Sequence, residues 1–256
     1  MTKFNVDSNE FKEALESLQV KGKQLRNSGF SSGNLGTTFH AHLYENTLSL
    51  YNGDSTFMVK INLTVEGQEN GNFVADSSHL LPYLKSFSET ITVSVGDFIS
   101  ISDARRNVNN PILVNHPSQE ALERLKEMTK HVHYEPQPQT LFAFGNSNFE
   151  GAFTLNQIDF QKCIKNCEIV KSGIYRLNFH QNTVTLSSSI NASNQYSETL
   201  NTVFTTGESA TLDFSSPLYS FFNKDQLLNF YVRDEFPLLI VSDDRVLVKA
   251  PHVGGN

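Results

Sequence analysis

Two segments that lie 149 residues apart share one pattern of apolar, capping and acidic residues. One begins at Phe4 and the other at Phe153. The aligned pairs are Phe4 with Phe153, Val6 with Leu155, Phe11 with Phe160, Ala14 with Cys163, Leu15 with Ile164, Asp7 with Asn156, and Glu10 with Asp159. Both segments predict a short strand that leads through an N-cap into a helix with an apolar stripe. Because a repeat has to form the same supersecondary unit twice, this duplication constrains the fold most strongly.

Two further landmarks match in the same order along the chain. A Ser-Ser pair beside an apolar run occurs at Ser77-Ser78 and at Ser215-Ser216, and later strand-like runs end in Asp103-Ala-Arg105 and in Asp243-Asp-Arg245. These landmarks are 138 and 140 residues apart, and loop-length changes within each half absorb the difference of about ten residues. The sequence therefore predicts two similar halves.

Each half also resembles two copies of a smaller unit, in which a strand and a capped helix precede three strands. We expect helices from Asp7 or Ser8 to about Leu18, after Ser77 or Ser78, from about Gln157 to Cys167, and from Ser216-Pro217. In the first half the expected strands are 4–7, 37–43, 47–51, 56–63, 72–75, 90–95, 98–102 and 112–115. In the second half they begin at Ala152 and Ala210 and then cover 173–179, 183–188, 198–204, 227–231, 238–241 and 246–249. The predicted fold class is α+β with antiparallel sheets.

The residues between the halves have a different texture. A short amphipathic stretch after Pro117 is followed by a run from His131 to Gln139 that contains two prolines. Such a run breaks regular structure and is typical of a connector between domains. We predict an N-terminal domain at 1–115, a connector at 116–140 and a C-terminal domain at 141–256.

The composition excludes several classes of protein. Hydrophobic residues make up 38% of the 256 and charged residues 18%, without a long block of one charge, so the chain can bury a core. The first residues lack the apolar run of a signal peptide, and no stretch approaches the roughly 20 apolar residues of a membrane span. We expect a cytoplasmic protein with no membrane partner. Its net charge of -7 disfavours a surface that binds nucleic acid everywhere, but it allows a local basic stripe.

Motifs for catalysis are missing from the sequence. It contains no Walker loop, dinucleotide-binding glycine fingerprint, nucleophile elbow or HExxH motif. The two cysteines, Cys163 and Cys167, lie one helical turn apart and are expected to be small core residues. Asp103 and Asp243 occupy equivalent places, where an aspartate shapes a turn with the arginine that follows. We expect no enzyme activity, no cofactor and no metal site.

Positive charge recurs around the expected helices. The residues concerned are Lys12, Lys21, Lys23, Arg26, Lys85, Lys162, Lys165, Lys171 and Lys224. Scattered lysines are also usual on any solvated helix face. If the four helices lie on one side of the sheets, however, these side chains form a positive strip on a negative protein, which suits contacts to phosphates without base readout.

The order of these features resembles that of the DNA sliding clamps. This family includes proliferating cell nuclear antigen, the bacterial polymerase III beta subunit and the clamps of tailed bacteriophages. The resemblance covers nearly the whole chain and rests on the repeated strand-helix-three-strand unit. Ser102-Asp-Ala-Arg105 is similar to the phage clamps in particular, whereas Val248-Lys-Ala-Pro251 is similar to the end of the eukaryotic and archaeal clamps. A viral origin fits the first of these segments.

The resemblance implies a ring of six similar domains, so that a two-domain chain forms a homotrimer. Helices would line the hole, antiparallel sheets would form the outside, and edge strands would join across subunits. The implied function is that of a processivity factor, which encircles duplex DNA without sequence preference and tethers the replicative polymerase after a clamp loader has placed it. Partner proteins would dock at Leu141, Phe142, Pro251, His252 and Val253.

Three alternatives remain open from the sequence. Within the family, the chain could be a checkpoint-type subunit of a heteromeric clamp. Outside it, the chain could be a β-rich viral structural or interaction protein without a DNA role, or an enzyme. The acidic residues Glu10, Glu13 and Glu16 beside Lys12 also make the first helix less basic than a helix that lines such a hole. A viral protein would work in the cytoplasm of its host.

Overall fold

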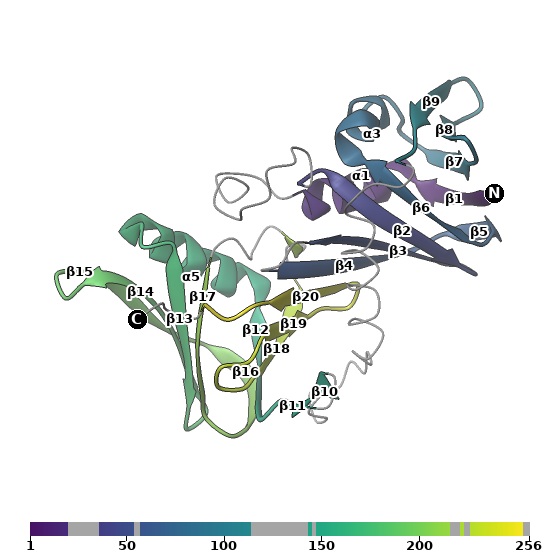
Figure 1. The fold of residues 1–256 in the computed structure, drawn as a ribbon. Coiled ribbons are helices and arrows are strands. Elements are labelled where there is room, and N and C mark those ends of the chain that lie inside the picture. The colour runs from purple at the N-terminus through teal and green to yellow at the C-terminus, as the bar shows by residue number, and fades with distance from the viewer. Residues whose placement is uncertain are drawn as a thin grey trace. The chain divides into compact units, whose positions relative to one another are not determined.

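The computed structural model describes residues 1–19, 36–53, 57–113, 143–144, 147–215, 221–222 and 226–252. The chain divides into two compact units, unit 1 from Met1 to Glu127 and unit 2 from Met128 to Asn256. In Figure 1 the labelled elements up to β9 belong to unit 1 and those from β10 to β20 belong to unit 2. The predicted connector at 116–140 lies outside the described residues, so the domain boundaries stay a prediction.

Unit 1 contains two antiparallel groups of strands. Its described elements are β1 (Thr2–Asp7), α1 (Ser8–Leu18), β2 (Thr38–Tyr44), β3 (Thr47–Gly53), β4 (Phe57–Thr64), β5 (Glu66–Glu69), β6 (Gly71–Asp76), α3 (Ser77–Leu84), β7 (Thr90–Val95), β8 (Phe98–Ser102) and β9 (Asn107–Pro111). One group has the order β5-β1-β7-β8-β9 and the other the order β4-β3-β2-β6. The helices α1 and α3 pack against each other.

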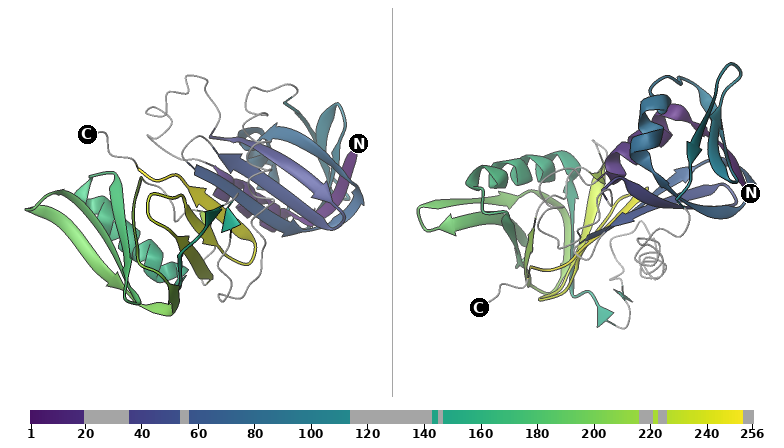
Figure 2. Two further views of the ribbon diagram at one scale, coloured as in Figure 1. Left: turned by 60° about the horizontal axis from the view of Figure 1, so that its bottom comes forward. Right: turned by 45° about the horizontal axis from the view of Figure 1, so that its top comes forward.

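Unit 2 repeats this arrangement. Its described elements are β10 (Ala143–Phe144), β11 (Ser147–Asn148), β12 (Gly151–Asn156), α5 (Gln157–Val170), β13 (Ile174–His180), β14 (Thr183–Asn191), β15 (Asn194–Leu200), β16 (Thr202–Gly207), β17 (Ala210–Ser215), β18 (Leu227–Val232), β19 (Leu238–Val241) and β20 (Arg245–Lys249). Within the unit, the strand orders are β16-β12-β18-β19-β20 and β15-β14-β13-β17. In both views of Figure 2, α5 lies along the β13–β15 sheet.

Apart from β10 and β11, the described strands of the two units match one for one, which confirms the predicted fold class and its duplication. The orders β5-β1-β7-β8-β9 and β16-β12-β18-β19-β20 correspond element by element, with α1 equivalent to α5. In unit 1 the first strand of one repeat pairs with the second repeat, Phe4 opposite Val93, and β6 pairs in turn with β2, Ala75 opposite Phe39. Unit 2 shows the same exchange. Neither repeat therefore has a complete sheet of its own.

The helices begin where the sequence predicts. The Asp7 carboxylate caps α1, because its Oδ1 accepts the backbone N–H groups of Asn9 at 2.9 Å and Glu10 at 3.0 Å. The cap of α3 is Asp76, whose Oδ1 accepts the N–H of Ser78 at 2.8 Å, rather than either serine. The N-cap of α5 is Asn156, without a side-chain hydrogen bond.

Phenylalanines join each helix to its own first strand. In unit 1 the rings of Phe4 and Phe11 meet edge to face with centroids 6.2 Å apart. In unit 2 their counterparts, Phe153 and Phe160, both contact Phe230, at 4.8 Å and 5.0 Å between centroids. At most 1% of each of these five side chains is exposed. The positions that revealed the repeat are thus the core of each unit. The burial of each of these side chains stabilises the folded state by about 1.5–3 kcal/mol.

Some boundaries differ from the prediction. The third strand after α3 is β9 at Asn107–Pro111, not 112–115. The strand expected at 198–204 is two strands, β15 and β16, which belong to different sheets. Strand β5 was not predicted, and α5 continues to Val170, three residues beyond Cys167. The helix expected at Ser216 lies outside the described residues.

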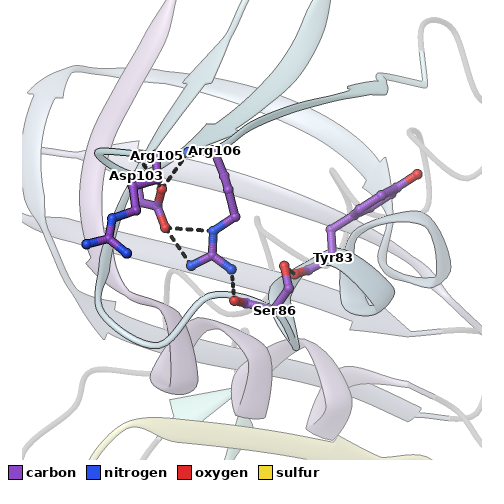
Figure 3. A network of polar contacts seen from close by, with 5 residues as sticks. All are labelled: Tyr83, Ser86, Asp103, Arg105 and Arg106. Atoms are coloured by element: carbon purple, nitrogen blue, oxygen red, sulfur yellow. Dashed lines mark hydrogen bonds and ion pairs between the residues drawn. The ribbon is translucent and has the colours of Figure 1, made fainter.

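Arg106 ties the loop between β8 and β9 to the end of α3 (Figure 3). Its guanidinium donates to Asp103 Oδ2, from Nε at 3.0 Å and Nη2 at 2.7 Å. It also donates to the carbonyl oxygen of Ser86 and lies over the Phe87 ring, 4.7 Å from the centroid. The other carboxylate oxygen of Asp103 accepts the backbone N–H groups of Arg105 and Arg106, and these bonds, with the ion pair, lower the pKa of Asp103. Asp103 therefore shapes the turn, as predicted.

The equivalent residue in unit 2 is Arg245. Its Nη1 donates to the carbonyl oxygen of Phe221 at 2.5 Å, and its Nε lies 3.1 Å from Asp244 Oδ2. The Ser242 N–H donates to the Arg245 carbonyl, as the Asp103 N–H does to Arg106. Arg245 therefore matches Arg106, not Arg105, and the predicted alignment is one residue out of register because strand pairing, not the spacing from aspartate, sets the loop.

We expect Arg245→Gln to destabilise the protein more than the matched Arg106→Gln. Arg245 is only 3% exposed, whereas the Arg106 side chain is 42% exposed. Losing a buried, hydrogen-bonded charge leaves its partners unsatisfied, which costs about 3 kcal/mol or more. The measurement is the urea concentration at half-unfolding of each variant. Equal shifts for the two variants would show that the two loops are held with equal strength.

Candidate nucleic-acid interface

The exposed face of α1 is mainly acidic. Its buried stripe consists of Ser8, Phe11, Ala14, Leu15 and Leu18. On the opposite side Glu10 and Glu13 are exposed, and Glu16 and Lys12 are half-buried. The Lys12 ammonium, a predicted DNA contact, donates to Asn9 Oδ1 of its own helix at 3.3 Å.

The exposed face of α5 carries two lysines. Its buried stripe is Gln157, Phe160, Cys163, Ile164, Cys167 and Val170. On the opposite side the exposed residues are Ile158, Lys162, Lys165 and Ile169. Their spacing of four, three and four residues places them on one line along the helix. The structure therefore brings together two of the predicted DNA-binding residues, Lys162 and Lys165.

Two more predicted residues lie at helix ends. Lys171 is the C-cap of α5, exposed and in the left-handed conformation with φ of 60°. Lys85 is the C-cap of α3 and is also exposed. Cations at helix C-termini interact favourably with the helix dipole, so both positions have a structural reason besides any contact with nucleic acid. The remaining candidates Lys21, Lys23, Arg26 and Lys224 lie outside the described residues.

Arg105 is a cation that the sequence analysis assigned only to a turn. It is exposed beside the end of α3, because the Arg106 bond to Ser86 holds the loop there. In Figure 3 its guanidinium points away from Asp103, which Arg106 occupies. Arg105 and Arg106 are thus exposed cations on a loop that is bonded to Ser86, the residue after Lys85. The sequence did contain a signal for these cations, because Arg105 and Arg106 are adjacent in a chain that has few adjacent cations.

The described end of the chain returns to β17. The His252 N–H donates to the carbonyl oxygen of Asp213 at 2.6 Å, and Pro251 is half-buried while His252 is exposed. The Asp213 carboxylate pairs with Arg176 on β13, with N–O distances of 2.8 Å and 2.7 Å. This pairing lowers the pKa of Asp213. Of the five predicted partner-binding residues, Pro251 and His252 are placed at this sheet, whereas Leu141, Phe142 and Val253 lie outside the described residues.

The two cysteines are core residues, as expected. Cys163 and Cys167 are fully buried on the inner face of α5, and the neighbouring thiol together with burial raises the pKa of Cys163. In the part of the chain that the structure describes, no three histidine, cysteine, aspartate or glutamate side chains group as metal ligands do. No described helix is long and apolar enough to span a membrane.

The sequence matches no protein-family model and no curated protein. Solved structures, in contrast, are similar over the whole chain. The DNA polymerase III beta chain of Streptococcus pneumoniae has a TM-score of 0.73 at 15% identity, over 99% of this chain and 65% of its own. The beta subunit of Thermotoga maritima has a TM-score of 0.73 at 14% identity, over 100% of this chain and 66% of its own. PCNA of A. fulgidus, bound to the C-terminal region of FEN-1, has a TM-score of 0.71 at 12% identity, over 100% of both chains.

These similarities show the fold. The chain has the sliding-clamp fold, with antiparallel sheets and helices repeated in both units. It spans about two thirds of the length of the bacterial beta chains, 65% and 66%, and the full length of the archaeal PCNA chain. The predicted fold is therefore confirmed.

We expect the stability that the Arg176–Asp213 pair contributes to disappear in acid. The pKa of Asp213 is lowered from 3.8 in the fold, so the contribution is complete above that value and is lost as the pH falls through the lowered pKa. The Arg176 side chain is 58% exposed, and solvent screening limits the effect to about 1 kcal/mol. Asp213→Asn should therefore lower the free energy of unfolding at pH 7 but not below the lowered pKa.

Urea unfolding of the parent and of Asp213→Asn at a series of pH values measures this difference. Asp97→Asn, at an exposed loop position, is the control and should differ little from the parent at any pH. A difference for Asp213→Asn that persists undiminished at pH values below the lowered pKa would contradict the assignment of the effect to the ion pair.

Proposed function

We propose that the chain is a DNA sliding clamp, three copies of which form a ring around duplex DNA and tether a replicative polymerase to it. The observation that carries the proposal is the fold, which matches an archaeal PCNA over the full length of both chains. Such a protein holds its partners in place and catalyses no reaction. The low identities of 11–15% among the similar structures make the assembly and the partners matters for experiment.

Strand order supports the closure of a ring. The strands β5 and β6, and likewise β16 and β17, lie where the chain passes from one sheet to the other, with at most two residues between them. The strands β9 and β15 stand at the opposite ends of their sheets, and among the described residues each pairs on one side only. An open edge is a template for pairing with another chain. Pairing of β9 with β15 of the next copy is heterologous and generates a closed ring if the rotation fits.

The distribution of charge supports a contact with DNA that reads no sequence. The net charge of the chain is -7, yet Lys162 and Lys165 project from one outward line of α5. Lysines contact phosphates as point charges and carry no base specificity. An acidic exterior would keep DNA from other surfaces, so that the ring holds DNA by enclosing it. The lysines outside the described residues, Lys21, Lys23 and Lys224, and Arg26 with them, remain candidates for further contacts.

Partner proteins would dock at the chain end on β17. The backbone bond from His252 to Asp213 holds this segment at the sheet, beside which a short hydrophobic peptide could bind Pro251 and His252 together with Leu141, Phe142 and Val253. The A. fulgidus PCNA structure holds a C-terminal region of another protein, FEN-1. We infer that the polymerase and the clamp loader use this segment, and that the protein acts in the cytoplasm, which is that of the host if the chain is viral.

We expect light scattering of the purified chain to give three times the mass of 28.7 kDa in a concentration-dependent equilibrium. A homotrimer without added partners supports the clamp. A monomer that trimerises only when other clamp-like chains are present would support a checkpoint-type heteromeric subunit instead.

We expect the protein to stay on nicked circular DNA through a gel-filtration column and to leave once the circle is cut. Enclosure explains this result because a ring can slide off a DNA end, whereas a protein that simply adheres to DNA binds whether or not the DNA has an end. Equal retention on circular and linear DNA would contradict the clamp, and no retention on either, with the loader present, would favour a structural protein without a DNA role.

A further inference from the structure

The strands β4, β3, β2 and β6 of unit 1 present two faces, because side chains alternate along each strand. The helix α1 packs on one face, where the Asn52 amide of β3 donates to the carbonyl oxygen of Leu18 at 2.7 Å. The next residue along β3 from Asn52, Tyr51, therefore lies on the opposite face, which we call the outer face of unit 1. Strand pairing places three further residues on the outer face beside Tyr51, namely His40 on β2, Lys60 on β4 and Val74 on β6.

The centre of the outer face is buried. His40, Tyr51 and Val74 are exposed to only 1%, 4% and 6%. The rings of His40 and Tyr51 lie 6.2 Å apart between centroids, and the Lys60 ammonium lies 5.7 Å from the centroid of the Tyr51 ring. Burial also lowers the pKa of Lys60. An antiparallel sheet that faces water on one side keeps that side solvated. Because α1 packs on the opposite face, the cover of the outer face comes from outside the described helices.

Unit 2 contains the equivalent face with polar residues. Equal strand pairing puts Arg176, Ser187 and Asp213 at the positions of His40, Tyr51 and Val74, respectively. The Arg176 and Asp213 side chains are 58% and 26% exposed and pair with each other, and Ser187 is half-buried. The sheet therefore forms when this face is polar and open to solvent. The fold does not require the buried residues of unit 1 at these positions, so their burial needs a separate cause.

The chain reaches the outer face of unit 1 at Leu113. The Leu113 N–H donates to the Val74 carbonyl oxygen at 2.9 Å, and the half-buried side chains of Leu113 and Met58 pack against Val74. Pro117 follows four residues later. Four extended residues span up to about 13 Å, and the two strand spacings from β6 to β3 amount to about 10 Å. The residues from Pro117 onward can therefore lie over the buried centre of the outer face.

The segment from Pro117 to Met128 lies outside the described residues, and its sequence has the pattern of a surface that must be buried. The apolar residues recur at the spacing of one helix face and are Ala121, Leu122, Leu125 and Met128. An element with one apolar stripe has to bury it against another element. Unit 1 continues as a compact unit to Glu127, so this segment belongs to the unit whose outer face is covered.

We propose that the segment from Pro117 to Met128 docks its apolar stripe on the outer face of unit 1, over His40, Tyr51 and Val74. The inference concerns unit 1 alone and does not depend on the function proposed above. It makes the first half of the predicted connector part of the N-terminal domain. The span that joins the two domains is then 129–140 rather than 116–140.

Hydroxyl-radical labelling of the full chain, measured for each tyrosine by mass spectrometry, tests the proposal. In the parent we expect Tyr51 to react as slowly as the core residue Tyr175, which is 1% exposed, while Tyr44, which is 60% exposed, reacts fast. The variant Leu122→Ser/Leu125→Ser removes the centre of the apolar stripe. We expect it to raise the Tyr51 rate at least about threefold, because the segment then leaves the face more often, and to leave Tyr175 slow.

The matched control is Glu123→Ser/Lys126→Ser, which changes two residues of the same segment that lie off the stripe and keeps the net charge. It should leave the Tyr51 rate as in the parent. A Tyr51 rate in the parent as high as that of Tyr44 would show an open face and overturn the proposal. A Tyr51 rate that stays low in both variants would also overturn it, and a rise on dilution would then identify a second copy as the cover.

The converse experiment changes the face instead of the segment. His40→Arg/Tyr51→Ser/Val74→Asp gives the outer face the residues of its unit 2 counterpart, including the ion pair, so the sheet keeps a composition that this fold already contains. Because proteolysis follows the population of the released segment, we expect a glutamate-specific protease to cleave after Glu120 at least about tenfold faster than in the parent.

The control for this experiment is Asn178→Ala/Ser187→Ala on the equivalent face of unit 2, which should leave cleavage after Glu120 unchanged. Circular dichroism and the urea midpoint show whether each variant keeps the fold. Faster cleavage in the unit 1 variant alone supports docking. Equal acceleration in both variants, or none in either, contradicts it.

Discussion

Backbone pairing between strands of different repeats is the constraint on which each unit depends. The first strand of the first repeat pairs with the second repeat in each unit, β1 with β7 and β12 with β18. The first strand of the second repeat pairs with the first repeat in turn, β6 with β2 and β17 with β13. A repeat on its own would leave an apolar helix stripe and open strand edges, so the repeats have to form together. The phenylalanines at Phe4, Phe11, Phe153 and Phe160 lie where strand and helix meet this exchange, and their burial stabilises it.

The same constraint leaves the other face of each helix unspecified. Packing decides what lies on the buried stripe of α1 and of α5, since a change there opens a cavity or forces strain. It does not decide what lies on the outward line, where a substitution usually changes stability by less than about 0.5 kcal/mol. Glu13 and Lys162 can therefore occupy equivalent positions without any difference in fold. The fold therefore leaves the charge of that line undetermined.

The sequence predicts the repeat well because the positions that match between its copies are buried residues with a fixed spacing. It predicts loops poorly, since Arg106 rather than Arg105 matches Arg245 and only strand pairing reveals this. The strand expected at 198–204 is two strands because Asn201 carries the chain from one sheet to another, and alternation continues across it. For the candidate interface, the sequence identifies the cationic residues but does not show on which face of a helix each one lies. Lys12 and Lys162 are both helix lysines, and only the structure shows that Lys12 is half-buried and bonded to Asn9 whereas Lys162 is exposed.

A short cationic line on an acidic protein fits binding by enclosure better than binding by affinity. A protein that grips DNA needs many phosphate contacts, and each adds about 0.9 to its salt slope and to the barrier against movement along the duplex. A ring cannot dissociate sideways, so a few weak contacts are enough to centre the duplex. Lysine suits this task, because its ammonium group passes from one phosphate to the next without the paired geometry that a guanidinium imposes.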